Sequence, residues 1–147
     1  MKIIHTINRS FYPLLFTIIA IALISCNTTR SIGIEEGWEL LGEQKVNFVK
    51  DKDVIDVDSR YQFTAIKFRV EDKDVIIKDL VVIFQNGDKL TPAIEEAIPA
   101  GGSSREIELA RDGRYIDRIE FTYRSTGSLL EGRSNVLVLG KRYYPGY

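Results

Sequence analysis

Histidine and cysteine are almost absent from this sequence of 147 residues, which holds one of each, His5 and Cys26. A lone cysteine cannot form an intramolecular disulfide bond. His5 lies in an N-terminal segment that we expect the mature protein to lose, for reasons given below. The mature chain then has no histidine, which excludes histidine acid–base catalysis, the usual catalytic triads and zinc sites built from histidine and cysteine.

An excess of charge of one sign is also missing. The chain carries 20 basic and 21 acidic residues, and removal of residues 1–25 takes away Lys2 and Arg9 but no acid. No basic field remains for nucleic acid. The two signs are interspersed, which excludes a polybasic lipid-binding patch. We therefore expect no nucleic-acid partner.

A hydrophobic run long enough to span a membrane is lacking as well. Residues 14–24 are apolar except for Thr17, a run of about 11 residues, whereas a helix that crosses the hydrocarbon core takes about 20. Basic residues, Lys2 and Arg9, precede the run. This pattern predicts a helical signal peptide over residues 1–25.

The end of that run, Leu23-Ile24-Ser25-Cys26, resembles the lipobox of bacterial lipoproteins. The resemblance implies a diacylglyceryl thioether on the Cys26 sulfur, cleavage after Ser25 and fatty acylation, such as with palmitate, of the new amino group. Each buried methylene contributes roughly 0.8 kcal/mol, so two or three chains anchor a protein firmly in a membrane. The alternative is an unmodified thiol on a secreted or otherwise tethered protein, where an unpaired cysteine would be a liability.

Asn27 stands where enterobacterial lipoproteins that stay in the inner membrane carry aspartate, so the resemblance favours the outer membrane of the cell envelope. Residues 26–37 are mostly polar, small or acidic and predict a short tether. Residues 38–147 then suit a single folded domain with one modest core.

Short apolar alternation bounded by turn residues predicts an all-β domain, an antiparallel β-sandwich of about eight strands with jelly-roll or Greek-key connections. The expected strands are residues 38–41, 45–49, 54–57, 61–70, 75–84, 105–109, 115–124 and 136–139. Residues 90–100 contain Pro92 and Pro99 and predict a loop with a single helical turn at 93–97.

Residues 75–84 are the most apolar of these segments. Their Val81-Val82-Ile83 run favours a central strand covered on both faces. Lys78 and Asp79 interrupt the pattern and indicate a bulge. Gln85-Asn86-Gly87-Asp88 then predicts a tight turn.

Four segments of the domain resemble the YaaI-like group of small exported bacterial proteins of uncharacterised function. They are Trp38-Glu39-Leu40-Leu41-Gly42, Val82-Ile83-Phe84-Gln85-Asn86-Gly87, Arg114-Tyr115-Ile116-Asp117-Arg118-Ile119-Glu120-Phe121-Thr122-Tyr123-Arg124 and Val136-Leu137-Val138-Leu139-Gly140. The resemblance implies an exported protein and assigns no active residues.

The densest acidic cluster comprises Asp51, Asp53, Asp56 and Asp58. Carboxylates on neighbouring loops can bind Ca²⁺, although this spacing is not that of an EF-hand loop. The alternative, which we favour, is the solvated face of an edge strand with no metal bound. No other cofactor is expected.

Aromatic side chains could stack on sugars or bind a protein partner. The candidates are Tyr143, Tyr144 and Tyr147 in the C-terminal tail, with Trp38 and Tyr115 as further possibilities. Alternatively, Trp38 anchors the core and the tail packs back on the sandwich. Arg105, Arg114 and Arg124 could form an anion-binding face, but ion pairs with Glu106, Asp117 and Glu120 explain them more simply.

These features predict a lipid-anchored envelope protein that acts as a noncatalytic binding or interaction module rather than an enzyme. One alternative is a carbohydrate-binding or carbohydrate-active protein, since a glycosidase needs only two suitably spaced carboxylates. Another is an accessory subunit of an envelope complex. A domain of about 110 residues with short loops offers little room for a deep cleft, which favours binding through a surface.

Overall fold

Two antiparallel sheets make up the computed structural model, which describes residues 33–46, 52–125 and 133–146. Residues Ile34–Tyr147 form one structural unit. Its strands are β1 (Trp38–Lys45), β2 (Lys52–Asp56), β3 (Phe63–Val70), β4 (Val75–Phe84), β5 (Lys89–Leu90), β6 (Glu96–Ile98), β7 (Ile107–Glu108), β8 (Ile116–Ser125) and β9 (Asn135–Arg142). Within the described ranges, no helix is long and apolar enough to cross a membrane.

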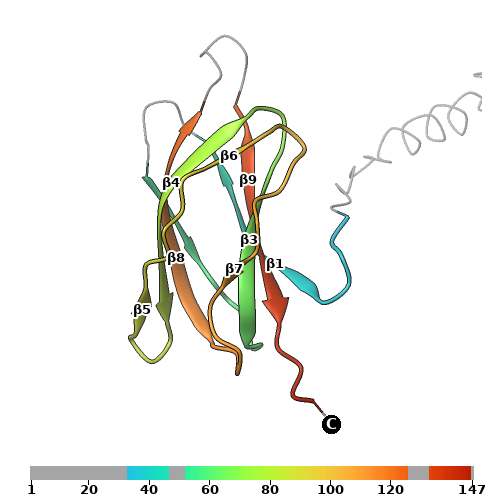
Figure 1. Cartoon of the computed structure of the whole chain (residues 1–147), viewed down its shortest axis with the longest axis vertical. Helices are drawn as coiled ribbons and strands as arrows, with labels where there is room; N and C mark the ends of the chain where they lie inside the picture. The colour runs from blue at the N-terminus through green and yellow to red at the C-terminus, as the bar shows by residue number, and fades with distance from the viewer. Residues whose placement is uncertain (1–32, 47–51, 126–132, 147) are drawn as a thin grey trace, which may run out of the picture. The chain divides into compact units, whose positions relative to one another are not determined.

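The strand order is that of a jelly roll (Figure 1). One sheet has the order β1-β9-β3-β7, and the other has the order β2-β8-β4-β5, with β6 also paired to β4. The chain changes sheet at almost every connection, and the first and last strands lie side by side. When β5 and β6 are counted as one position, this is the eight-position arrangement of two nested Greek keys. The all-β sandwich prediction is therefore confirmed.

The core lies between the sheets because alternate residues of each strand point inward. In β3, Ile66, Phe68 and Val70 are fully buried. In β8, Ile119, Phe121 and Tyr123 are at most 3% exposed. The rings of Phe68 and Phe121 meet edge to face across the two sheets, with centroids 5.2 Å apart. The inward faces expected for residues 61–70 and 115–124 are confirmed.

Gly42 does not separate two strands, so the prediction of separate strands at 38–41 and 45–49 is wrong. β1 continues through Gly42, with a register shift between Leu40 and Gly42 where it pairs with β9. A Cβ at Gly42 would lie 2.4 Å from Cγ2 of Ile55. Glycine therefore marks a close approach of β1 to β2 at a bulge, not a turn. Residues 47–49 lie outside the described ranges.

The helical turn predicted at 93–97 is also wrong. Residues 96–98 form β6, whose partners are Val75–Ile77 in the first half of β4. The second half of β4 pairs instead with β5. Ladder hydrogen bonds to β4 satisfy this segment's backbone groups, and they outweigh a local helical preference of only a few tenths of a kcal/mol per residue.

Three details of β4 agree with the sequence. It lies inside its sheet, between β8 and the short strands β5 and β6. Its pairing with β8 shifts register between Ile77 and Asp79, which confirms the predicted bulge. The turn that follows has Gly87 at φ +89°, a value that glycine adopts without strain.

Substitution of Gly140 by alanine should destabilise the domain by about 1–3 kcal/mol because the core there has no space for a methyl group. A Cβ at Gly140 would lie 2.6 Å from a ring carbon of Phe63 and 2.9 Å from a methyl of Leu41. Urea denaturation of the purified protein measures the change. Gly146→Ala is the control, since nothing lies within 4 Å of its added methyl. Equal stability of the two variants would contradict the packing described.

Candidate functional site

Tyrosine side chains gather at one end of the sandwich, which we call the tyrosine end and define by Tyr61, Tyr115, Tyr143 and Tyr144. Backbone hydrogen bonds hold its segments together, from Tyr143 N to Gln62 O at 2.8 Å and from Gln85 N to Tyr115 O at 3.0 Å. β4 and β9 end here, while β3 and β8 begin here. In Figure 1 this end carries the C-terminus and the turn between β4 and β5.

The tyrosine end also holds most of the exposed large apolar side chains in the described part of the chain. There are five such residues, and Tyr144 (65% exposed), Tyr61 (44%) and Tyr115 (43%) lie at this end. Of the other two, Ile34 (38%) precedes β1 beside Glu35, which pairs with Lys67 in the middle of β3, and Val54 lies on β2. Scattered apolar residues are ordinary on a surface, whereas a gathering at one place indicates a contact.

Arg142 organises the centre of the tyrosine end. Its Nε and Nη2 atoms both lie 2.7 Å from Oε2 of Glu39, and its guanidinium lies 4.1 Å from the centre of the Tyr61 ring. Hydrogen bonds to Glu39 and Tyr144 raise the pKa of Arg142. Ser59 donates to the other oxygen of Glu39 at 2.8 Å. Tyr61 and Tyr144 therefore contact a guanidinium whose charge is already paired with the Glu39 carboxylate.

The tail tyrosines differ from one another. Tyr143 is half-buried and packs against Gly113 and Gln62. Its position agrees with the alternative that the tail packs back on the sandwich. Tyr144 remains exposed. Tyr147 lies outside the described residues. Only Tyr144 of these three therefore offers a free aromatic face in the described structure.

Trp38 is 9% exposed and lies on the outer face of the first sheet, not in the core between the sheets. The ammonium groups of Lys67 and Lys141 lie 4.1 and 5.8 Å from its ring centre. Lys67 also pairs with Glu35 at 3.0 Å. With both lysines close to the ring, Trp38 acts as a cation–π partner rather than an open stacking surface.

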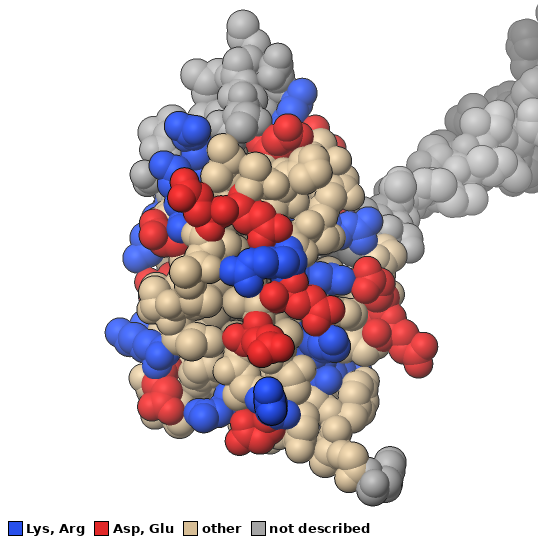
Figure 2. Space-filling model, in the orientation of Figure 1, with Lys and Arg blue, Asp and Glu red and all other residues tan. Residues whose placement is uncertain are grey.

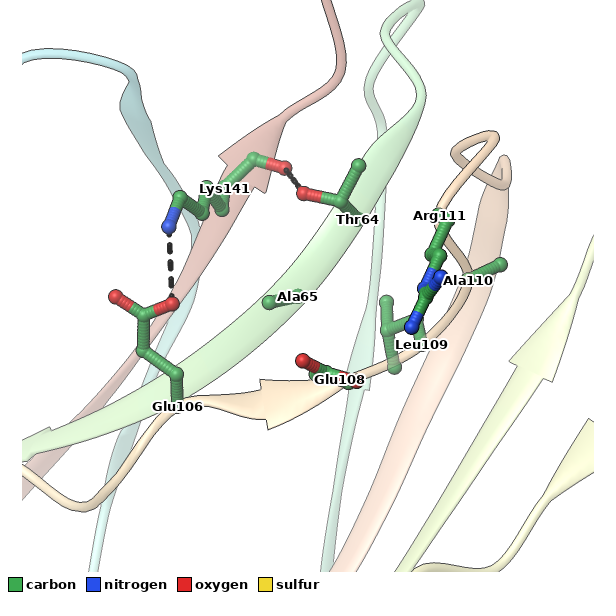
Figure 3. Close-up of a pocket in the computed structure, with 8 residues that line it drawn as sticks. All are labelled: Thr64, Ala65, Glu106, Glu108, Leu109, Ala110, Arg111 and Lys141. Carbon is green, nitrogen blue, oxygen red and sulfur yellow. Dashed lines mark hydrogen bonds and ion pairs between the residues drawn. The ribbon is translucent and has the colours of Figure 1, made fainter.

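A polar hollow of about 320 Å³ lies beside the edge strand β7 (Figure 3). Its lining is Thr64, Ala65, Glu106, Glu108, Leu109, Ala110, Arg111 and Lys141. The small side chain of Ala65 lies on β3 between the charged groups and leaves the space open. A larger hollow, of about 480 Å³, lies between the middle of β4 and residues 91–95.

The charged groups of the hollow beside β7 are only partly paired. Lys141 Nζ lies 3.0 Å from Glu106, and the Lys141 carbonyl accepts from Thr64 at 3.5 Å. Glu108 and Arg111 have no side-chain hydrogen bond or ion pair with any described residue. A carboxylate and a guanidinium facing one hollow can accept from and donate to the hydroxyl groups of a polar ligand.

The aspartates considered for calcium do not share one face of β2. Asp53 is 2% exposed and accepts a hydrogen bond from the Tyr123 hydroxyl at 2.7 Å, whereas Asp56 and Asp58 are exposed. Asp51 lies outside the described residues, and no cluster of three or more acidic, histidine or cysteine side chains suited to a metal occurs among the described ones. The solvated-face interpretation therefore holds for Asp56 but not for Asp53.

The sequence contained a signal for this buried aspartate. Asp53 alternates along the chain with Ile55 and Val57, and alternate residues of a strand point to the same face, which here is the buried one. On the same pair of strands, Glu120 of β8 faces outward. Hydrogen bonds from Lys52 and Arg118 lower the pKa of Glu120.

The three arginines considered for anion binding do not converge. Arg114 and Arg124 lie at opposite ends of β8, and Arg114 pairs with Asp88 at 3.4 Å. Arg105 donates to the Ala93 carbonyl at 2.8 Å. On the face drawn in Figure 2, acidic and basic side chains alternate without a large patch of either sign.

Fold and surface together define a small jelly-roll β-sandwich with charge-paired faces. The chain belongs to the family described as Domain of unknown function (DUF2541), whose model matches residues 15–140. No curated protein matches it. Among solved structures it is similar to a chain from the structural and functional characterisation of Pseudomonas aeruginosa AlgX, with 12% identity and a TM-score of 0.43. That match covers 69% of this chain and 26% of the other.

Replacing Tyr123 by phenylalanine should cost about 1–3 kcal/mol of stability because the buried Asp53 carboxyl loses a hydrogen-bond donor. The ring stays, so any loss reports on the hydroxyl alone. Tyr115→Phe is the matched control, since Tyr115 is exposed and should change the free energy of unfolding by less than about 0.5 kcal/mol. Thermal or urea unfolding that gives the same stability for both variants would show that the Asp53–Tyr123 contact contributes little.

Proposed function

We propose that this protein is a lipoprotein of the bacterial cell envelope, anchored through Cys26, whose jelly roll is a noncatalytic binding module. The observation that carries the proposal is the sequence Leu23-Ile24-Ser25-Cys26 directly after an apolar run too short to span a membrane. The folded unit starts at Ile34, so only a short polar segment separates it from the cysteine. Its surface charges are interspersed, which suits a protein that works near a membrane without binding it through basic residues.

A finer assignment, to the YaaI-like group and to the outer membrane, is part of the same proposal. The four segments that resemble that group correspond to most of β1, the end of β4 with its turn, β8 and most of β9. These segments supply much of the core, so a shared fold would explain the resemblance. The outer membrane rests on Asn27, which follows the cysteine.

Cys26→Ser should abolish lipid attachment and leave residues 1–25 uncleaved, because cleavage of lipoprotein precursors follows modification of the cysteine. We expect the wild-type protein in the outer-membrane fraction after density separation. The variant should migrate as the larger precursor and leave that fraction. Ser25→Ala, which keeps a small residue before the cysteine, is the control and should be processed normally. A Cys26→Ser protein that is cut and distributed like wild type would refute the anchor.

A carbohydrate-binding role is the second candidate, and the hollow beside β7 is the observation that favours it. The hollow is about 320 Å³ in volume, within the range of small-ligand sites. Glu108 and Arg111 supply an acceptor and donors that are not paired within the described residues. Hydroxyl pairs of a sugar match such groups, and Ala65 leaves room for the flat side of a ring.

If the hollow binds a sugar, Glu108→Gln and Arg111→Gln should each weaken binding about tenfold, as expected for the loss of a charge-assisted hydrogen bond. A glycan array with the full protein would identify the ligand, and calorimetry would measure affinity. Asp56→Asn, which removes an exposed carboxylate on β2, should leave affinity unchanged. Absence of any glycan ligand, or equal affinity in all three variants, would exclude sugar binding at this hollow.

A further inference from the structure

The middle of β4 has no strand beside it on the side away from β8, and we call this stretch, residues 78–81, the β4 gap. β6 pairs with residues 75–77 on one side of the gap, and β5 pairs with Val82 and Ile83 on the other. Residues 91–95 run opposite the gap, and no backbone hydrogen bond joins these two described segments. The hollow of about 480 Å³ lies between them.

Leu80 is the residue whose backbone groups face the gap. Along a strand, the N–H and C=O groups of successive residues point alternately to the two neighbouring strands. Phe84 N donates to Asp88 O at 2.9 Å, on the side of β5. Val82 and Leu80 lie two and four residues earlier, so their groups point to the same side, where Val82 pairs with Leu90. Within the described chain, the N–H and C=O of Leu80 have no backbone partner on that side and are available to a ligand.

The sequence keeps the gap open. If the β5 pairing were extended by two residues, Pro92 would lie opposite Leu80, and proline has no N–H to donate. The next carbonyl, that of Ala93, instead accepts a hydrogen bond from the Arg105 guanidinium at 2.8 Å. Ile94 is 6% exposed and packs in the core. These contacts hold residues 91–95 in place without closing the ladder, so the hollow is part of the folded structure.

Both ends of the gap are closed by strands (Figure 1). β6 and β5 occupy the same edge of β4 on either side of residues 78–81. Four residues at about 3.4 Å each leave roughly 14 Å of free edge. A partner peptide that adds a strand needs an exposed edge along which it can continue. The gap therefore suits a single amide group on a compact ligand rather than a peptide strand.

We propose that the β4 gap binds the acetamido group of an N-acetylated sugar. An acetamido group carries one N–H and one carbonyl, which complement the C=O and the N–H of Leu80. Its methyl group would meet Pro92 and Ala93, which line the hollow, and the volume is within the range of small-ligand sites. The site lies on the sheet that does not contain β7, so it is separate from the hollow beside β7. It does not depend on lipid at Cys26.

Polar side chains of the hollow provide partners for the hydroxyl groups of a sugar ring. Lys78, Thr91 and Glu95 line the hollow, and none has a side-chain hydrogen bond or ion pair with any described residue. Asp79 also lines it but already accepts a hydrogen bond from the Thr122 hydroxyl at 2.6 Å. An ammonium group, a hydroxyl and a carboxylate together supply donors and acceptors, and sugar hydroxyls need both.

NMR of the full, processed protein labelled with ¹⁵N-leucine tests the site directly, because the Leu80 N–H itself makes the contact. At millimolar concentration, at least one of N-acetylglucosamine, N-acetylgalactosamine and N-acetylmannosamine should shift the Leu80 amide signal. Glucosamine and glucose lack the acetyl group and should not shift it. A sugar that binds the hollow beside β7 would instead shift Leu109, which lines that hollow. A Leu80 signal that moves with all of these sugars, or with none, would overturn the proposal.

Ala93→Leu places a larger side chain in the hollow and should weaken binding of the N-acetylated sugar at least about fivefold. Ala97→Leu is the matched control, since Ala97 is exposed on β6 and does not line the hollow. Circular dichroism checks that both variants are folded. Equal affinity in the two variants would show that the sugar binds elsewhere and would contradict the site.

A blocked amino acid, N-acetylalanine N-methylamide, distinguishes a sugar from a peptide as the source of the amide. It presents the same acetamido group without a sugar ring. The proposal predicts that it shifts the Leu80 signal less than the N-acetylated sugar does at the same concentration, because it lacks the ring hydroxyls. An equal or larger shift would identify a peptide as the ligand and would overturn the assignment to a sugar.

Discussion

Apolar contact between the inner faces of two sheets is the constraint on which the rest of this structure depends. Neighbouring strands come from distant parts of the chain, as when β1 pairs with β9, so no local segment is stable alone. The edge-to-face contact of Phe68 and Phe121 is one of those that join the sheets. Because the strands are fixed at the core, their connecting segments meet at the two ends. The tyrosine end exists for this reason.

The period-two alternation made the architecture predictable. In β3 and β8 it identified the inward residues, and in β4 the charged pair Lys78-Asp79 identified the bulge. What the alternation could not supply was pairing between segments. Gly42 resembles a strand break in the sequence, yet the side chain of Ile55 requires a glycine there. Residues 96–98 resemble a loop, yet they complete the edge of β4.

The candidate site was predictable only in part, for the same reason. The sequence drew attention to Tyr115 and Tyr144 but gave no reason to join them with Tyr61, which lies on a different connection. The hollow beside β7 was not predicted, since Glu108 and Lys141 lie on strands that meet only through β3. Asp53 was grouped with exposed acids because of its neighbours in sequence, although its alternation with Ile55 and Val57 indicated an inward-facing side chain.

In the proposed lipoprotein the lipid on Cys26 provides the attachment, and the hollow beside β7 provides a candidate binding surface. Everything about location depends on the Cys26 sulfur. The most direct measurement is incorporation of labelled palmitate by cells that produce the chain: the account predicts label in the wild-type protein and none in a chain without Cys26. A wild-type protein that takes up no fatty acid would contradict it.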